Sequence, residues 1–279
     1  MRVTLLGTGT PAVDPQRQAA ALLVEIGAEK LLVDAGRGIT LQLQRAGVLP
    51  QRIDFIFITH HHYDHIGSLG ELLLTIWHAG RETPLTLFGP AGTAGIVEAL
   101  WRHIYAREIA FALFRRPERV HLRDLVQVRE VEPGLVYRGG AWQILTEYVD
   151  HGNSLGLSRE DWPCLGYRLE AEGKVVAISG DTVACPGLDR LAREADLLVQ
   201  CCYLAEAEMT GPAARSLADH IIACSDQAGK IAARNRVKKL VLSHIEPKSE
   251  VLLRSMLDDV RRDYSGEVWL GEDLMVFDL

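Results

Sequence analysis

Apolar residues recur along the chain in two patterns, short continuous runs and longer stretches with helical spacing. The short runs are typical of buried β-strands, and the longer stretches of amphipathic helices. Predicted strands cover residues 1–7, 19–26, 30–34, 53–58, 84–89, 142–149, 165–171, 174–179, 195–203, 239–243 and 268–279. Predicted helices cover residues 39–46, 69–77, 94–105, 188–193, 225–234 and 250–264. The chain is therefore predicted to be an α/β protein.

The predicted elements form two blocks, each with strands followed by helices. The sequence has no linker rich in Pro, Gly or Ser and no repeat of fixed period, so residues 1–279 are expected to form one domain. One region of weak periodicity, residues 111–128, is crowded with basic side chains: Arg115, Arg116, Arg119, His121 and Arg123. A solvated face is the preferred interpretation of this cluster, and a clamp for a substrate anion is the alternative.

The composition is ordinary for a globular protein, with 48% hydrophobic and 24% charged residues among 279. The net charge of −7 gives no general attraction to nucleic acid, which argues against a polyanionic substrate unless a local basic patch overrides it. The apolar stretch at residues 1–7 is too short for a signal peptide, and no run approaches a membrane span. A cytoplasmic location is therefore expected.

The five cysteines lack C-x-x-C spacing and lie mostly in apolar runs, which predicts reduced core residues. Cys185 is the exception to consider, because it lies four residues beyond Asp181 and is thus close to a candidate site.

Metal-binding residues are densest in the run from Thr59 to Gly67, between an apolar strand and an apolar helix. Imidazole suits zinc, and a carboxylate beside several imidazoles adds a ligand that can also act as a base. The candidate ligands exceed what one tetrahedral ion with an open position needs, so two ions are expected at His60, His62, Asp64 and His65. His61 lies between them and is expected to point away. A solvated histidine-rich loop or a tag remnant is the alternative, but the run is internal.

This run resembles the H-x-H-x-D-H signature of the metallo-β-lactamase superfamily. Three further positions of that family are matched in order downstream, at the ends of predicted strands: His151, Asp181 and His244. The resemblance implies a four-layered αββα sandwich of two mixed β-sheets flanked by helices, with the metals at one edge.

The resemblance also implies how the ligands divide between two zinc ions, with Mn²⁺ or Fe²⁺ as alternatives. One ion would be held by His60, His62 and His151 and the other by Asp64, His65 and His244, with Asp181 bridging. Such a pair shares a hydroxide and neutralises a forming oxyanion, while Asp64 orients the bridging water or accepts its proton. His62 stands where redox di-iron relatives carry a glutamate, which favours hydrolysis. Asp34 is expected among the surroundings of the site, with a cap for the helix at residues 39–46 as the alternative.

Further motifs resemble the ribonuclease Z and arylsulfatase-like branch, including Leu6 to Pro11 and Ser179 to Thr182. In that branch a histidine at the place of His220 sits near the metals and protonates a leaving group, so His220 is predicted to be catalytic. The chain departs from the branch because Ile221 replaces a small hydroxyl residue and because a glutamate-containing sequence is replaced at residues 200–203.

Only 30 positions separate His151 from Asp181 (181 − 151), so the chain has no room for the long arm with which tRNA-processing members grip tRNA. The preferred hypothesis is therefore a binuclear zinc hydrolase that cleaves a small anionic ester, a phosphodiester or an aryl sulfate. The alternative is a tRNA 3′-processing endonuclease, and a non-catalytic binding module is a third. The branch is expected to form homodimers.

Overall fold

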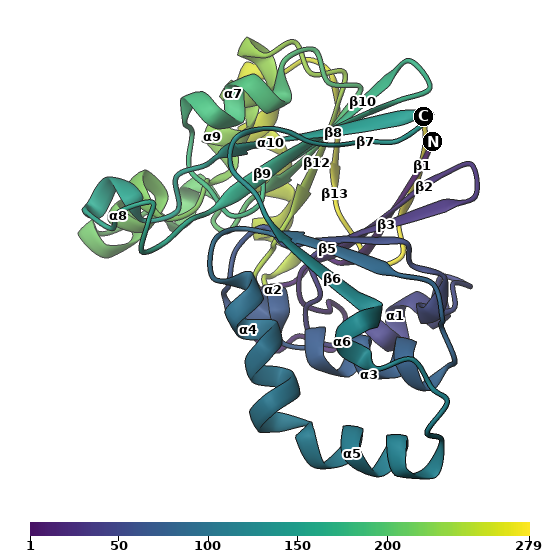
Figure 1. Cartoon of the computed structure of the whole chain (residues 1–279). Helices are drawn as coiled ribbons and strands as arrows, with labels where there is room; N and C mark the ends of the chain where they lie inside the picture. The colour runs from purple at the N-terminus through teal and green to yellow at the C-terminus, as the bar shows by residue number, and fades with distance from the viewer.

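Two β-sheets face each other at the centre of the computed structural model, which describes residues 1–279 (Figure 1). The first sheet has seven strands in the order β14-β1-β2-β3-β4-β5-β6. Its strands are β1 (Arg2–Gly7), β2 (Ala21–Ile26), β3 (Glu29–Val33), β4 (Phe55–Phe57), β5 (Leu85–Gly89), β6 (Val126–Glu130) and β14 (Val276–Asp278). Strands β14 to β3 pair antiparallel and β3 to β6 pair parallel, so the sheet is mixed.

The second sheet also has seven strands, in the order β13-β12-β11-β10-β9-β8-β7. Its strands are β7 (Gly134–Arg138), β8 (Trp142–Tyr148), β9 (Leu165–Ala171), β10 (Lys174–Ile178), β11 (Leu197–Cys201), β12 (Lys239–Ser243) and β13 (Glu267–Leu270). Strands β7 to β10 pair antiparallel and β10 to β13 pair parallel. Every residue of β11 is buried, as expected for a parallel strand covered on both faces.

Helices cover the outer face of each sheet (Figure 1). On the side of the first sheet lie α1 (Ile39–Arg45), α2 (Tyr63–Ile66), α3 (Leu69–His78), α4 (Thr93–Ala99), the π-helical turn η2 (Leu100–Ile104), α5 (Ala106–Arg115) and α6 (Leu122–Leu125). On the side of the second sheet lie α7 (Pro186–Ala192), α8 (Pro212–His220), α9 (Ser225–Arg234) and α10 (Glu250–Asp263). Short 3₁₀ turns are η1 (Pro50–Arg52), η3 (Asn153–Leu155) and η4 (Glu206–Glu208).

Three buried apolar clusters hold these layers together. The cluster between the sheets includes Phe57 and Tyr167. A second cluster, which includes Trp77, joins the first sheet to its helices, and a third, which includes Ile231 and Met256, joins the second sheet to its helices. Three cores between four layers confirm the predicted αββα sandwich.

The structure corrects several predicted elements. The last segment does form strands, but β13 and β14 belong to different sheets. The edge strand β7 and the helix α8 are not predicted, because most of their residues are at least partly exposed and carry little apolar periodicity. The helix predicted at residues 94–105 changes into a π-helical turn at Leu100. The region of residues 111–128 consists of the end of α5, then α6 and the start of β6.

Four strands deliver the predicted ligands to one edge of the sandwich. The histidine-rich loop follows β4, and His151, Asp181 and His244 follow β8, β10 and β12. Because the carboxyl ends of parallel strands meet at the same edge of a sheet, side chains far apart in the sequence converge there. None of the helices is long and apolar enough to cross a membrane.

Candidate metal centre

The seven predicted ligands lie in two groups of converging side chains. One group contains His60, His62, His151 and Asp181, and the other contains Asp64, His65 and His244. Within each group, the atoms able to bind a metal lie within 4.8 Å of one another. Apart from Asp181, which the prediction places between the two ions, these are the two sets assigned to separate ions from the sequence.

In the first group, Nδ1 of His62 lies 3.0 Å from Nε2 of His60 and 3.1 Å from Nε2 of His151. Two nitrogen ligands of a tetrahedral zinc ion, each about 2.0–2.1 Å from the metal, lie roughly 3.3 Å apart. The three imidazoles are therefore spaced as ligands of one ion would be.

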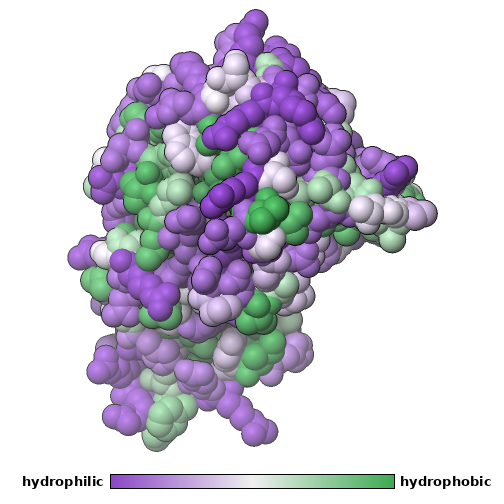
Figure 2. Space-filling view, turned by 180° about the vertical axis from the view of Figure 1, so that it is seen from behind, coloured by the Kyte–Doolittle hydropathy of each residue, from purple (hydrophilic) through white to green (hydrophobic).

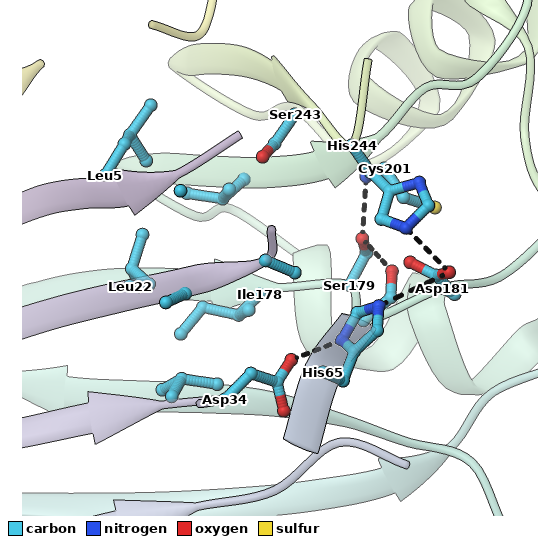
Figure 3. Close-up of a pocket in the computed structure, with 16 residues that line it drawn as sticks. Leu5, Leu22, Asp34, His65, Ile178, Ser179, Asp181, Cys201, Ser243 and His244 are labelled. Carbon is cyan, nitrogen blue, oxygen red and sulfur yellow. Dashed lines mark hydrogen bonds and ion pairs between the residues drawn. The ribbon is translucent and has the colours of Figure 1, made fainter. Parts of the chain in front are cut away.

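In the second group, Oδ2 of Asp64 lies 3.1 Å from Nε2 of His244 and 3.7 Å from Nε2 of His65. Asp181 connects the groups, because its Oδ2 lies 3.2 Å from Nε2 of His244, 3.5 Å from that of His65 and 3.9 Å from that of His151. Figure 3 shows the rings of His65 and His244 turned toward Asp181. One carboxylate oxygen thus faces both groups, as a bridging ligand would.

The donor set fits a divalent metal. Nε2 of His65 is buried and has no hydrogen-bond partner in the protein, although it points at two carboxylates. Imidazole nitrogens with carboxylate oxygens suit zinc and neighbouring transition metals. The two groups therefore have the character of a binding site for divalent metal.

Contacts outside the two groups fix the imidazole rings. Nδ1 of His65 donates to Oδ2 of Asp34 at 2.7 Å, and Asp34 also accepts from the backbone N–H of Thr59 at 2.8 Å. Oγ1 of Thr59 lies 3.0 Å from Nδ1 of His60, and Nδ1 of His151 lies 2.5 Å from the carbonyl of Ile221. Such outer partners set the tautomer and orientation of metal-binding histidines. Asp34 thus takes the predicted place in the surroundings of the site, and the cap position of α1 is occupied by Gly38.

The close packing of charges shifts the pKa values of the site. Burial alone would raise the pKa of Asp181, but His244 and His65 hold it well below its usual value. Burial would lower the pKa of His65, but Asp181 and Asp34 raise it well above the usual value. Burial, and then the charge of His151, lower the pKa of His62 to about 4. Asp181 is therefore held ionised and His62 neutral, the forms that bind metal, whereas a metal ion at His65 would have to displace a proton that Asp181 and Asp34 stabilise.

The structure does not bring His220 into either ligand group. Its Nδ1 lies 3.0 Å from Oγ of Ser154, and its carbonyl accepts from the N–H of Gly152 at 2.7 Å. The next buried side chain of this segment, Ile222, packs with Cys201 and Ala223 in a small apolar cluster.

Two neighbours of the ligands complete the surroundings. Trp162 is not among the predicted site residues, yet its ring centroid lies 4.7 Å from that of His62 and its Nε1 donates to the carbonyl of His151 at 3.1 Å. A single tryptophan in a loop carries no motif that marks it as a neighbour of a metal ligand. His61 points away as predicted, with Nε2 2.9 Å from Oγ1 of Thr93.

The five cysteines are free, and four of them are buried. Cys185 is partly exposed, and its Sγ lies 3.7 Å from Oγ1 of Thr182. It belongs to neither ligand group. The prediction of reduced structural cysteines agrees with this arrangement.

Comparison with known proteins gives consistent matches along the chain. A family model described as "Anti-Pycsar protein Apyc1" matches residues 1–213. A curated protein named ribonuclease Z from Mycobacterium avium (strain 104) is 33% identical over 283 residues, which cover 98% of this chain and 96% of the relative.

Solved structures agree with the sequence matches. The crystal structure of human tRNase Z, short form, superposes with a TM-score of 0.74 at 26% identity and covers 100% of this chain and 99% of its own. The metallo-β-lactamase fold protein YhfI from Bacillus subtilis has a TM-score of 0.74 at 19% identity and covers 99% of this chain and 98% of its own, which shows the shared fold. The chain thus belongs to the Apyc1 family as that model defines it and to the ribonuclease Z branch of the metallo-β-lactamase superfamily, and it is a metal-dependent hydrolase.

Proposed function

We propose that this protein is a ribonuclease Z-type endonuclease that uses two zinc ions to hydrolyse a phosphodiester bond of precursor tRNA. The observation that carries the proposal is the position of Oδ2 of Asp181, within 4 Å of three ligand imidazoles drawn from both groups. A chain that retains every ligand of such a centre fits a hydrolase. The name of its curated relatives, ribonuclease Z, supports RNA as the substrate.

The short segment between His151 and Asp181 leaves no room for a tRNA-gripping arm, and from the sequence this favoured a small ester. The absence of the arm does not count against the present proposal. The Mycobacterium avium relative named ribonuclease Z aligns over 283 residues that include 96% of its own length. It therefore has no long additional segment relative to this chain. The net charge of −7 is a weak argument against an RNA substrate, because binding of RNA depends on the local arrangement of basic residues.

We assign one zinc ion to His60, His62 and His151 and the other to Asp64, His65 and His244, with Asp181 between them. When bound, two such ions lower the pKa of water toward neutrality and neutralise the negative charge that develops on the phosphate. Asp64, which is buried, orients that water or accepts its proton. Asp34 and Thr59 keep the rings of His65 and His60 in place.

The proposed role of His220 is to protonate the leaving oxygen, and it requires a movement. Its imidazole contacts Ser154 at the rim of the site, so the ring must turn from Ser154 toward the scissile bond when substrate binds. Replacing His220 by alanine should slow cleavage of an alkyl leaving group, the RNA 3′-oxygen, much more than cleavage of a nitrophenyl group, which leaves without protonation.

A second candidate function is hydrolysis of a small anionic ester with a good leaving group, such as an aryl phosphodiester or aryl sulfate. The observation that favours it is the small apolar cluster of Cys201, Ile222 and Ala223, because Cys201 belongs to residues 200–203, the segment that replaces the glutamate-containing sequence expected of tRNA-processing members. A site without a proton donor close to the leaving oxygen suits leaving groups of low pKa.

Purified protein assayed on precursor tRNA and on bis(p-nitrophenyl) phosphate separates the two candidates. The proposal expects cleavage at a single position of the tRNA, with a kcat/KM far above that for the small ester. Asp64→Ala should abolish both activities, while Asp263→Ala serves as the matched control because it removes an exposed carboxylate at the end of α10, away from both ligand groups. Efficient turnover of the small ester with no cleavage of tRNA would overturn the proposal in favour of the second candidate.

Metal analysis tests the centre independently of activity. Two zinc ions per chain are expected in the purified protein, and a variant that lacks His60 should lose metal from the first group. A single ion per chain, or iron in place of zinc, would contradict the assignment.

A further inference from the structure

Helix α5 presents an exposed face that combines arginine and phenylalanine side chains. Residues three or four positions apart lie on the same side of a helix. Phe111 is four positions from both Arg107 and Arg115 and three from Phe114, so these four residues share one side of α5. All four are exposed, and Phe111 and Phe114 expose 62% and 83% of their surface. Arg116 extends the face beyond the helix end. Exposed large aromatic side chains beside unpaired charges mark an interaction surface.

The arginines of this face have no carboxylate partners. Arg107, Arg115 and Arg116 form no ion pair, whereas Arg102 and Arg123 nearby are each paired with Glu98. A hollow of about 310 Å³ opens between α5 and α3, and its lining contains no acidic residue: His78, Phe111, Ala112, Arg115, Arg116 and Arg119. One lining residue, His78, is in contact with a carboxylate, that of Glu108, at 3.1 Å.

One wall of the hollow is held rigid. The guanidinium of Arg119 lies 4.9 Å from the centroid of the Trp77 ring and donates to Nδ1 of His78 at 3.2 Å. Trp77 is fully buried and donates its own N–H to the carbonyl of Val120. The hollow is thus a preformed basic site whose arginines match the geometry of phosphate.

The helical arm that carries this face starts at the metal-binding loop. His61, within that loop, contacts Thr93, the first residue of α4. From Thr93, α4 and η2 run through twelve residues to Ile104, which corresponds to roughly 18 Å at 1.5 Å per residue. Figure 1 shows α5 beyond them at the lower end of the molecule, and α8 projecting from the other layer. A small ester at the metal centre cannot reach α5, but an RNA chain can.

We propose that this face of α5, with Arg116 and Arg119, binds the RNA substrate at a distance from the scissile bond and takes the part of the absent arm. The proposal rests on the proposed ribonuclease function. Arginine binds the phosphate backbone, and exposed phenylalanine rings stack on unpaired bases. RNA fits better than a second copy of this chain, because a twofold interface would place the unpaired arginines of one copy against those of the other. On the side seen in Figure 2, hydrophobic residues form several separate groups among hydrophilic ones.

The test compares Arg115→Ala/Arg116→Ala and Phe111→Ala/Phe114→Ala with a matched control, Arg254→Ala/Arg261→Ala on α10. The two control arginines are also exposed, and their replacement removes the same charge, but each of them is paired with a carboxylate on its own helix. The α5 variants are expected to raise KM for precursor tRNA about tenfold and to leave turnover of bis(p-nitrophenyl) phosphate unchanged. In the arginine variant, the slope of log KM against log salt should fall by about 1.4–1.8, the loss expected for two phosphate contacts.

An independent measurement of RNA binding separates this inference from the proposed function. Fluorescence anisotropy with labelled precursor tRNA should show the same loss of affinity in the α5 variants, whether or not the wild-type protein cleaves that RNA. Binding without cleavage by the wild type would contradict the proposed function but not this inference. Cleavage of tRNA by the wild type with unchanged KM and salt slope in the α5 variants would overturn the inference. A shift in sedimentation of those variants with unchanged RNA affinity would assign the face to a second copy of the chain and overturn it as well.

Discussion

Asp34→Asn tests how far the second ligand group depends on the partner outside it. The carboxylate accepts from Nδ1 of His65 at 2.7 Å and from the N–H and the hydroxyl of Thr59 at 2.8–3.1 Å. An asparagine has nearly the same shape and can still accept from Thr59 through its carbonyl oxygen. Its amide then faces Nδ1 of His65, which is a donor when Nε2 binds metal, so two donors oppose each other.

The structure sets the size of the expected effect. Loss of an outer partner costs about 10–100-fold in metal affinity, or about 1.4–2.7 kcal/mol at 1.36 kcal/mol per factor of ten. Asp34 and His65 are both buried, so no water is available to replace the lost hydrogen bond and its free energy is not recovered. The affinity of the second ion should fall within that range, while the first group, which Asp34 contacts only through Thr59, should change less.

The assay is a competition between the protein and a chromogenic chelator of known zinc affinity, read as two binding steps. Asp263→Asn, at an exposed position at the end of α10, provides the control. Circular dichroism of the metal-free proteins checks that the fold is intact. Two binding steps with wild-type affinities in Asp34→Asn would refute the reasoning that this hydrogen bond fixes His65 for metal.

Three further outcomes are expected. Trp162→Phe keeps a ring beside His62 but removes the N–H that donates to the carbonyl of His151, so kcat should fall several-fold with metal content unchanged; wild-type kcat would contradict this. Phe57→Ala deletes a fully buried ring stacked on Phe88, which should cost about 3–5 kcal/mol and lower Tm by roughly 5–8 °C in calorimetry. Burial alone would raise the pKa of Asp196, but Lys238 and the N–H of Val175 lower it, so its contribution to stability is present above its unfolded pKa and is lost as the pH falls through the folded value. Asp196→Asn should therefore reduce the dependence of unfolding free energy on pH at the acid end of urea titrations.

Much of the centre was predictable because its signals are local. Each ligand follows an apolar run directly, and runs of buried strand residues can be recognised without the rest of the fold. The same holds for α9 and β12, whose observed bounds coincide with the predicted ones. Strand β14 shows the limit: nothing within residues 276–278 indicates that they pair with β1, which lies at the other end of the chain.

His220 shows why a matched motif does not fix the position of a side chain. The carbonyl of the following residue, Ile221, is occupied by Nδ1 of His151, and the carbonyl of His220 accepts from Gly152. The backbone of this segment therefore supports a ligand, and that requirement sets where the imidazole of His220 can lie. Such a constraint comes from a contact between residues 70 positions apart, which the motif does not contain.

The contact between His61 and Thr93 connects the metal-binding loop to the helices that lead to the proposed RNA-binding face of α5. The loop that carries four ligands is fixed on one side by Asp34 and on the other by the start of the arm that ends at α5. An RNA bound at α5 would therefore be placed relative to the metals through the helical residues of α4 and η2. Binding far from the scissile bond contributes to catalysis only if it places the reacting phosphate. The arm would raise kcat/KM for RNA through KM and leave the turnover of small esters to the metal centre alone.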